Sequence, residues 1–410
     1  MTNKILCLAA ALLLAACGQQ QPETAGEPVD IDAEARRIAM SSIIVDTHID
    51  VPFRLIVAPQ DISGPTESGD FDYPRARTGG LNAPFMSIYT PARMEGSGAS
   101  KDMAEKLIDL VEGFATASPE KFAIATSVAD VRKQFAAGLI SLPMGMENGS
   151  PLEGDIANLH HFHERGIRYL SLSHGENNHL SDSSYDETKQ WHGISEFGAD
   201  VIREMNRLGI MIDVSHVSDD AFWAIMEITE APVIASHSSA RHFTPGFERN
   251  MSDEMILSVA QGGGVVQINF GSSFVTQEAR DYSEALMAAG KAHQAEHPEL
   301  TEAFLYREFP KMYAEKNGPL PFASLDDVLD HFDHVVKLAG VDHVGIGSDY
   351  DGVGDSLPTG LKDVSSYPNL VAGLLRRGYT EEDIRKILGE NLLRVWQAAE
   401  DYAATTSTST

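Results

Sequence analysis

The chain has 410 residues, of which 43% are hydrophobic and 22% are charged. This length and apolar content are enough to bury a large core. The composition excludes a disordered chain, a collagen and a disulfide scaffold. Acidic residues number 60 and basic residues 31, so the formal net charge is −29, and no long basic run offsets it. We therefore expect neither a nucleic acid nor an anionic membrane surface as a partner.

An export signal is predicted at the start of the chain. Residues 1–16 place one lysine before an apolar stretch of about a dozen residues, which is too short to cross a bilayer and typical of a secretory signal peptide. Leu14-Ala15-Ala16-Cys17 resembles the lipobox of bacterial lipoproteins, so we expect Cys17 to be acylated and to hold the protein at the membrane through lipid alone. An ordinary signal peptide with an incidental cysteine is the alternative.

The rest of the chain is predicted to form one domain between two irregular segments. Residues 17–29 are rich in Gln, Pro, Glu and Gly and predict a flexible tether, residues 30–402 predict a single domain, and residues 403–410 predict a disordered tail. Because Cys7 and Cys17 are the two cysteines of the chain, this domain has no thiol for catalysis, for a zinc site or for a disulfide.

Short β-branched or apolar runs recur along this domain, each bounded by Gly, Pro or polar residues. We predict strands at residues 43–50, 81–89, 139–147, 167–174, 209–216, 232–238, 264–270 and 344–350. Helix-like stretches separate most of them, at residues 101–116, 151–164, 195–208, 218–228, 252–260 and 324–338. The alternation predicts a parallel α/β sheet, and eight strands favour a (β/α)8 TIM-type barrel with insertions over a doubly wound open sheet.

Polar residues lie at or just past the C-terminal ends of the predicted strands. They are His48, Asp50, Glu147, His174, His216, His237, Asn269 and Asp349. One such residue alone is usually a cap or a support, but in a barrel this face is where active sites are built, and nearly every strand contributes to it here. Six other histidines lie away from these ends. A solvated helix face is expected for His160, His161 and His163, and structural roles for His331, His334 and His343.

The residue types at the strand ends predict two metal ions. His48 and Asp50 are two apart on a strand, so their side chains share a face and can hold one ion. His216 and His237 end consecutive strands and can hold a second, and the two carboxylate oxygens of Glu147 can bridge the pair. Nitrogen and oxygen ligands without sulfur favour two Zn²⁺ per chain, with manganese or iron as alternatives.

Such a pair of ions supplies the nucleophile of a hydrolase. Two cations about 3.5–4 Å apart hold a water between them and lower its pKa from about 15.7 to about 7, which gives a metal-bridging hydroxide at neutral pH. Asp349 is placed to carry the proton from this water to the leaving atom. Asp351 is the neighbouring alternative, because residues two apart on a strand share a face.

A family resemblance emerges from motifs in the order VDTHIDVP, GMENG, YLSLSH, DVSHVS, PVIASHSSAR, RNMSDE and GIGSDYDG. They resemble the membrane dipeptidases, also called renal dipeptidases, and the match extends from about residue 43 to LGENLLRVW at residues 388–396. The resemblance implies a (β/α)8 barrel with two zinc ions that cleaves free dipeptides, often with a D-residue at the C-terminal position. It also makes a homodimer the expected state.

The resemblance implies the same five metal ligands that the strand ends indicate, and it adds roles for three other residues. His174 matches the residue that steadies the carbonyl oxygen as it becomes an oxyanion. Arg249 matches the residue that binds the free carboxylate of the substrate, for which a guanidinium fork is well suited. Asp349 matches the proton shuttle.

Two departures from the family pattern concern Asn148, which stands where members commonly have Gly, and residues 271–322, an insertion expected on the active-site face. One alternative function is hydrolysis of another amide, a lactam or an ester by the same barrel. A second is that of a surface lipoprotein that binds a peptide or a metal without turnover.

For the location we expect a lipid anchor in the outer membrane facing the periplasm. Position 18 is Gly, whereas an Asp at this position often retains lipoproteins at the inner membrane.

Overall fold

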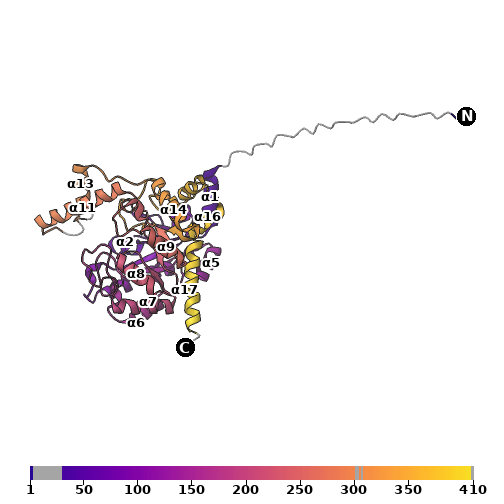
Figure 1. Cartoon of the computed structure of the whole chain (residues 1–410). Coiled ribbons are helices and arrows are strands. Elements are labelled where there is room, and N and C mark those ends of the chain that lie inside the picture. Colours follow the sequence, from indigo (N-terminus) through magenta and orange to yellow (C-terminus); the bar gives the residue numbers. More distant parts are fainter. Residues whose placement is uncertain (3–29, 301–303, 306–307, 408–410) are drawn as a thin grey trace. The chain divides into compact units, whose positions relative to one another are not determined.

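The computed structural model describes residues 1–2, 30–300, 304–305 and 308–407. The chain divides into two units, Met1–Asp30 and Ile31–Thr410, and the helices and strands described here all belong to the second (Figure 1). The predicted signal peptide, the lipidation site at Cys17 and the predicted tether fall on residues 3–29, outside the described part. Within the described part, no helix is both long and apolar enough to cross a membrane.

A closed parallel barrel forms the centre of the second unit, which confirms the predicted (β/α)8 class and excludes the open sheet. The strand order around the barrel is β1-β10-β9-β8-β7-β6-β5-β2, so the first and last strands close it by pairing. The strands are β1 (Ile44–Ile49), β2 (Leu81–Tyr89), β5 (Met144–Glu147), β6 (Ile167–Ser171), β7 (Met211–Asp213), β8 (Ile234–Ala235), β9 (Val265–Ile268) and β10 (Val344–Ile346).

Helices follow the strands and cover the barrel. Serines accept backbone hydrogen bonds at the starts of five of them, namely Ser127 before α5, Ser195 before α7, Ser218 before α8, Ser252 before α9 and Ser324 before α14. The helices are α1 (Ile31–Ser41), α2 (Val51–Val57), α3 (Tyr73–Gly79), α4 (Ser100–Ala117), α5 (Val128–Ala136), α6 (Ile156–Glu164), α7 (Glu196–Leu208), α8 (Asp219–Ile228), α9 (Asp253–Gln261), α10 (Ser272–Val275), α11 (Gln277–Glu296), α13 (Phe309–Asn317), α14 (Leu325–Ala339), α15 (Tyr367–Arg376), α16 (Glu381–Arg385) and α17 (Asn391–Ser407).

The strand predicted at residues 139–147 is in fact two strands. β4 (Ile140–Leu142) pairs with β3 (Phe122–Ile124) in a separate two-stranded sheet, and β5 belongs to the barrel. Pro143 lies between them and has no N–H to donate, so it interrupts the strand while its carbonyl accepts a hydrogen bond from the backbone of Met86. The continuous apolar run hid this break.

The predicted insertion 271–322 lies between β9 and β10 and contains helices α10, α11 and α13, of which α11 contacts α13 in the orange segment of Figure 1. The tail predicted from residue 403 is helical to Ser407 as the end of α17. Ala403 packs beside Gly209 at the end of α7, and this contact continues the helix past the point where composition alone predicts disorder.

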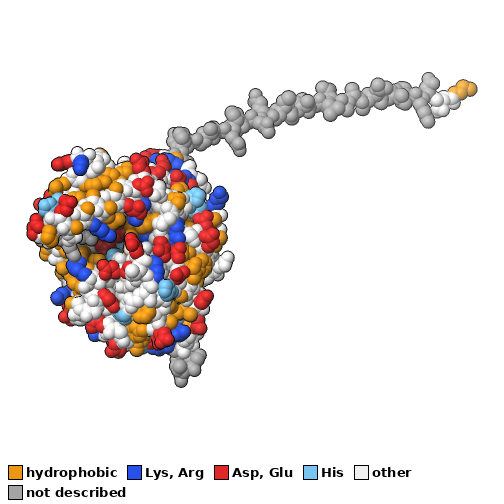
Figure 2. All heavy atoms as spheres, turned by 60° about the vertical axis from the view of Figure 1, so that its left-hand side comes forward, with side chains coloured by type: hydrophobic (Ala, Val, Ile, Leu, Met, Phe, Trp, Pro, Cys, Tyr) orange, Lys and Arg blue, Asp and Glu red, His pale blue; other side chains and the backbone are white. Residues whose placement is uncertain are grey.

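On the face shown in Figure 2 the acidic excess is not concentrated in one place. In Figure 2 the acidic side chains are spread over the visible face, interspersed with basic and apolar ones. The core inside and around the barrel is apolar, and its largest fully buried side chains include Trp396, Tyr169, Phe85 and Phe222. This rigid frame fixes the ends of the strands from which the candidate site is built.

Candidate metal centre

The carboxylate of Glu147 lies among four histidines at the C-terminal mouth of the barrel. Its Oε1 is 3.0 Å from Nε2 of His216, 3.3 Å from Nε2 of His237 and 3.7 Å from Nε2 of His174, and its Oε2 is 3.5 Å from Nε2 of His48. Glu147 is 3% exposed, so this carboxylate is almost completely removed from water. The structure therefore brings residues from five strand ends to one carboxylate.

A second group shares His48 with the first. Nε2 of His48 is 3.4 Å from Oδ2 of Asp50, and the ligand atoms of His48, Asp50 and Asp349 all lie within 4.8 Å of one another. Asn269, also predicted at a strand end, donates a hydrogen bond of 2.8 Å to Oδ2 of Asp349. The two groups of nitrogen and oxygen ligands therefore adjoin at His48.

Buried partners fix which nitrogen of His237 faces the cluster. Ser236 donates from Oγ to Oδ2 of Asp213 at 2.6 Å, and the same oxygen is 2.7 Å from Nδ1 of His237. Nδ1 of His237 must then be the donor to Ser236, which leaves the lone pair on Nε2 directed at Glu147. Asp213, which the sequence marks only by its place before His216, thus orients a histidine of the neighbouring strand.

Tyr169 orients the imidazole of His48 in a similar way. Its hydroxyl is 2.8 Å from Nδ1 of His48, and its ring occupies the space beside Gly145, where a Cβ would lie 2.0 Å from the ring. The glycine two residues before Glu147 therefore makes room for the side chain that orients His48. Sequence reasoning missed Tyr169, since a tyrosine in a buried strand gives no signal of such a contact.

Burial and charge set the protonation of these groups. Burial lowers the pKa of His216 and of His237 well below the ordinary value, so both are neutral and have a lone pair for a cation. Burial alone would raise the pKa of Glu147, but the neighbouring imidazoles of His48, His174, His216 and His237 hold it well below its usual range. The centre therefore holds an ionised carboxylate beside the neutral imidazoles of His216 and His237.

The donor set fits metal ions. Burial lowers the pKa of His48, but Tyr169, Glu147 and Asp50 raise it by more, to well above the ordinary value, so the surrounding groups favour a positive charge at Nε2, which a bound metal ion would supply in place of the proton. Among the described residues, neither Nε2 of His48 nor Oδ1 of Asp50 has a hydrogen-bond partner, although both are buried. Buried polar atoms without partners, facing a carboxylate, are the arrangement a bound cation satisfies.

Asp349 and its alternative Asp351 are separated by the structure. Both follow the end of β10 with φ angles of 63° and 67°, so strand alternation does not apply to them and the expected shared face is wrong. Asp349 joins the cluster, and burial together with Asp50 and Glu147 raises its pKa to about 7. Asp351 instead pairs with Arg54, at 2.9 Å between Nε and Oδ2.

Arg249 reaches the cluster from the loop between β8 and α9. Its Nη2 is 3.0 Å from Nε2 of His216 and donates to the carbonyl of His237 at 2.8 Å, while its Nη1 donates to Ser238 at 2.6 Å. The side chain is buried, and its Nε has no hydrogen-bond partner among the described residues. A buried guanidinium with a free donor at the edge of the cluster is suited to an anionic group.

Aromatic side chains stand around Arg249. The guanidinium carbon is 5.4 Å from the ring centre of Phe274, and Arg280 lies 3.8 Å over the ring of Phe247. Phe274 and Arg280 belong to the stretch 271–322, so the start of the predicted insertion approaches the site. Tyr185 is a further aromatic side chain of this group, and its ring centre lies 6.0 Å from the ring centres of both His216 and Phe247.

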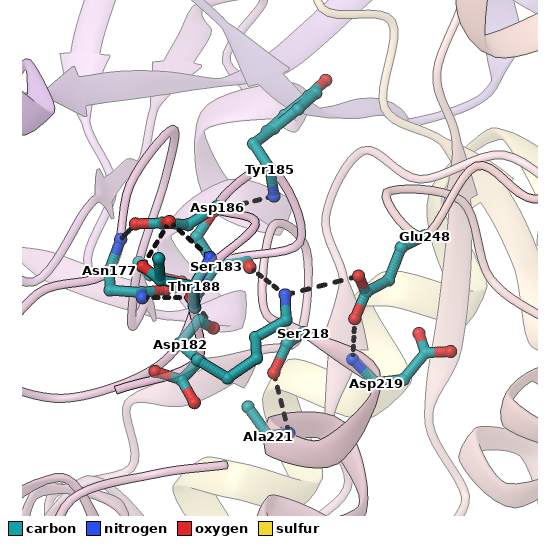
Figure 3. A network of polar contacts seen from close by, with 12 residues as sticks. Asn177, Asp182, Ser183, Tyr185, Asp186, Thr188, Ser218, Asp219, Ala221 and Glu248 are labelled. Atoms are coloured by element: carbon teal, nitrogen blue, oxygen red, sulfur yellow. Dashed lines mark hydrogen bonds and ion pairs between the residues drawn. The ribbon is translucent and has the colours of Figure 1, made fainter. Parts of the chain in front are cut away.

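A polar network holds the loop that carries Tyr185 (Figure 3). Asp182 accepts backbone hydrogen bonds from Gln190, Trp191 and Gly193. Lys189 is 2.8 Å from the carbonyl of Ser183 and 3.4 Å from the carboxylate of Glu248, the residue before Arg249. In Figure 3 the ring of Tyr185 points away from this network. The network thus links the Tyr185 loop to the Arg249 loop.

Asn148 adopts the left-handed conformation that explains why glycine is common at this position. Its φ is 75°, and its amide bonds Thr90, Ser150 and Asn178. We expect Asn148→Gly to lower the free energy of unfolding by about 1–3 kcal/mol through the lost hydrogen bonds. Asn148→Ala should cost about 1 kcal/mol more, because its Cβ is strained there. Urea unfolding checks both, and equal losses in the two variants would contradict the strain argument.

The fold and this cluster define a class of protein: a metal-dependent hydrolase built on a (β/α)8 barrel. The particular family follows from comparison with known sequences. The model of the membrane dipeptidase family, peptidase family M19, matches residues 32–410, so the chain belongs to this family and is a metallo-dipeptidase that acts on small peptides. The resemblance found in the sequence motifs is confirmed.

Solved structures of dipeptidases are similar over nearly the whole chain. The probable dipeptidase PvdM from Pseudomonas aeruginosa has 26% sequence identity and a TM-score of 0.79, covering 91% of this chain and 99% of that one. Dipeptidase AC, a metallopeptidase of family M19, has 25% identity and a TM-score of 0.72, covering 87% and 98%. A metallopeptidase from Rhodobacter sphaeroides, bound to a phosphinate mimic of L-Ala-D-Ala, has 25% identity and a TM-score of 0.71, covering 87% and 99%.

Proposed function

We propose that this metallo-dipeptidase hydrolyses free dipeptides, including L-Xaa-D-Xaa, with two zinc ions. The observation that carries the substrate class is Arg249, a buried guanidinium with an unpartnered Nε, 3.0 Å from an imidazole of the cluster. It would bind the free carboxylate at the end of a dipeptide, and a longer peptide has no carboxylate at that distance from the scissile bond. The dipeptide mimic bound by the relative from Rhodobacter sphaeroides supports the L,D stereochemistry.

The residues that would hold the ions follow from the two clusters. His48 and Asp50 would bind one ion, His216 and His237 the other, and Glu147 would contact both through its two oxygens. When bound, the pair supplies Lewis acidity that polarises the scissile carbonyl and lowers the pKa of the attacking water. The nitrogen and oxygen ligands without sulfur support zinc as the metal.

The other residues would act on the substrate directly. His174 is 26% exposed at the edge of the cluster, and burial keeps its pKa low, so a neutral imidazole is available to donate to the carbonyl oxygen. Asp349 would accept the proton that leaves the water when its oxygen joins the carbonyl carbon. It would then give this proton to the amine as the C–N bond breaks, so that no proton is gained or lost.

A panel of dipeptides tests the proposal. The protein without residues 1–17, loaded with zinc, is assayed on dipeptides with L- or D-residues at the second position, with N-acetylated and C-amidated forms as controls. We expect turnover that requires zinc and a free C-terminal carboxylate and that extends to D-residues at the second position. Equal turnover of the amidated forms would contradict the role of Arg249, and turnover confined to other amides, lactams or esters would contradict the dipeptide substrate.

Removal of the metal gives a second expected result. Dialysis against a chelator should abolish turnover, and two equivalents of Zn²⁺ per chain should restore it. Metal content is measured by elemental analysis beside each rate. Full activity after one equivalent, or activity that survives chelation, would contradict the paired ions.

We also propose that the protein is exported and lipid-anchored through Cys17, in the outer membrane facing the periplasm, and that it forms a homodimer. The lipobox motif and the apolar stretch before it support the anchor, and the family resemblance supports the dimer. Cys17→Ala should give either soluble exported protein or unprocessed precursor. A cleaved Cys17→Ala protein that stays in the membrane would contradict the lipid anchor, and a single-chain mass in solution would contradict the dimer.

A further inference from the structure

A second group of metal-ligating side chains lies apart from the candidate active site. It comprises His242 on the short 3-10 helix η3 (Arg241–Phe243), Asp253 in the first turn of α9, and His334 on α14. One ligand atom of each lies within 4.8 Å of those of the other two. The sequence predicts a structural role for His334, because it lies in the last helix before β10, away from the predicted active site.

The contacts within this group leave ligand capacity unused. Nε2 of His334 is 2.7 Å from Oδ1 of Asp253, but no side-chain hydrogen bond is found for His242 in the part of the chain that the structure describes. The rings of His242 and His334 stack with centres 4.4 Å apart and planes 20° apart. The two stacked imidazoles and the carboxylate of Asp253 thus offer three ligand atoms close to one position.

The residues next to His242 in the chain are anchored to the rest of the domain. His331, fully buried on α14, accepts the backbone N–H of Ala240 at 3.0 Å and bonds the carbonyl of Val275, and Phe243 packs on its ring at 4.4 Å. Arg241 pairs with both carboxylate oxygens of Asp219. The residues on both sides of His242 are therefore anchored to α14 and α8.

We propose that His242, Asp253 and His334 form a peripheral site for a divalent transition metal, with zinc as the ion. Two imidazoles and one carboxylate suit Zn²⁺, and tetrahedral ligands at zinc lie about 3.3 Å apart, so small side-chain rotations close the site. Asp253 opens α9, where the helix dipole stabilises its negative charge. The ion would tie η3, α9 and α14 together at the base of the loop that carries Arg249.

The number of zinc ions per chain tests this proposal. Protein whose catalytic ions are in place is dialysed against buffered free Zn²⁺, and bound zinc is measured by elemental analysis. We expect one equivalent more in the wild type than in His242→Ala or His334→Ala, with dipeptide hydrolysis retained in all three. Because loss of a ligand's hydrogen-bond partner alone weakens metal binding by about 10- to 100-fold, loss of a ligand should weaken the extra site at least as much.

His160→Ala is the matched control, because His160 also pairs with a carboxylate, at 2.6 Å from Glu204. This variant should keep the extra equivalent. The added zinc should also raise the melting temperature of the wild type and of His160→Ala but not of His242→Ala. Equal zinc content and equal thermal shifts in the wild type and His242→Ala would overturn the proposal. A result of that kind would leave the active-site assignment untouched, since activity and the catalytic ions are measured separately.

Discussion

Asp349→Asn is expected to keep both catalytic metal ions and to lose most of its turnover. The substitution keeps the size of the side chain and its contact with Asn269, but it removes the group that would exchange the proton. Proton transfer by a positioned side chain contributes about 10²- to 10⁴-fold to a rate, so kcat should fall by that factor. Saturating rates on a dipeptide and metal content by elemental analysis check this result. Full activity of a variant that holds two ions would contradict the assignment.

Asp351→Asn is the control for that experiment. The two aspartates have similar φ angles and lie two residues apart, but Asp351 pairs with Arg54 and accepts the backbone N–H of Asp70. We expect this variant to lose stability and to keep kcat within a few-fold of the wild type. If Asp351→Asn instead lost the greater part of its turnover, the proton shuttle would have to be reassigned.

Arg249→Lys is expected to lower kcat/KM for free dipeptides by about 30-fold to several thousand-fold. Lysine keeps the positive charge but lacks the fork that grips a carboxylate through two hydrogen bonds. Loss of one partner from a buried charged pair costs about 2–5 kcal/mol, which corresponds to this range. Kinetics on the dipeptide panel, with zinc content measured beside them because Arg249 touches His216, give the value.

C-amidated dipeptides supply the control for Arg249. They have no carboxylate to bind, so wild type and Arg249→Lys should hydrolyse them at similarly low rates. An equal loss on both kinds of substrate would show that Arg249 supports the metal ligands and does not bind the carboxylate. An unchanged kcat/KM on free dipeptides would favour another amide, a lactam or an ester as the substrate.

The barrel and most of the cluster could be predicted because the chemistry lies at strand ends. A parallel barrel brings the C-terminal ends of all strands to one mouth, so placing His48, Glu147 and His216 along the sequence was enough to expect them together. The structure places them around one carboxylate. Arg249 could be found only from the family resemblance, because it lies in a loop where no periodic pattern fixes its direction.

Other features of the structure were not indicated by the apolar pattern of the sequence. The break at Pro143 was hidden in an apolar run that reads as one strand. The hydroxyl of Tyr169 meets His48 only because Gly145 leaves room for the ring. Strand alternation misplaced Asp349 and Asp351, since β10 ends before them and both take left-handed backbone conformations. Only the contact of Tyr169 with His48 joins residues far apart in the sequence, whereas the other two differences are local interruptions of a strand.

The pairing of β1 with β10 determines when the protein can become active. His48 and Asp50 come from the first strand, and Asp349 follows the last, with backbone hydrogen bonds from Asp349 to His48 and from Asp50 to Tyr350. A ribosome must therefore synthesise almost the whole barrel before these side chains can meet, and closing so long a loop is a slow step in folding. Nascent or prematurely terminated chains that stop before residue 344 would lack β10 and therefore its pairing with β1. Hydrolytic capacity is thus coupled to completion of the polypeptide, and incomplete copies in the cell would be inert towards peptides.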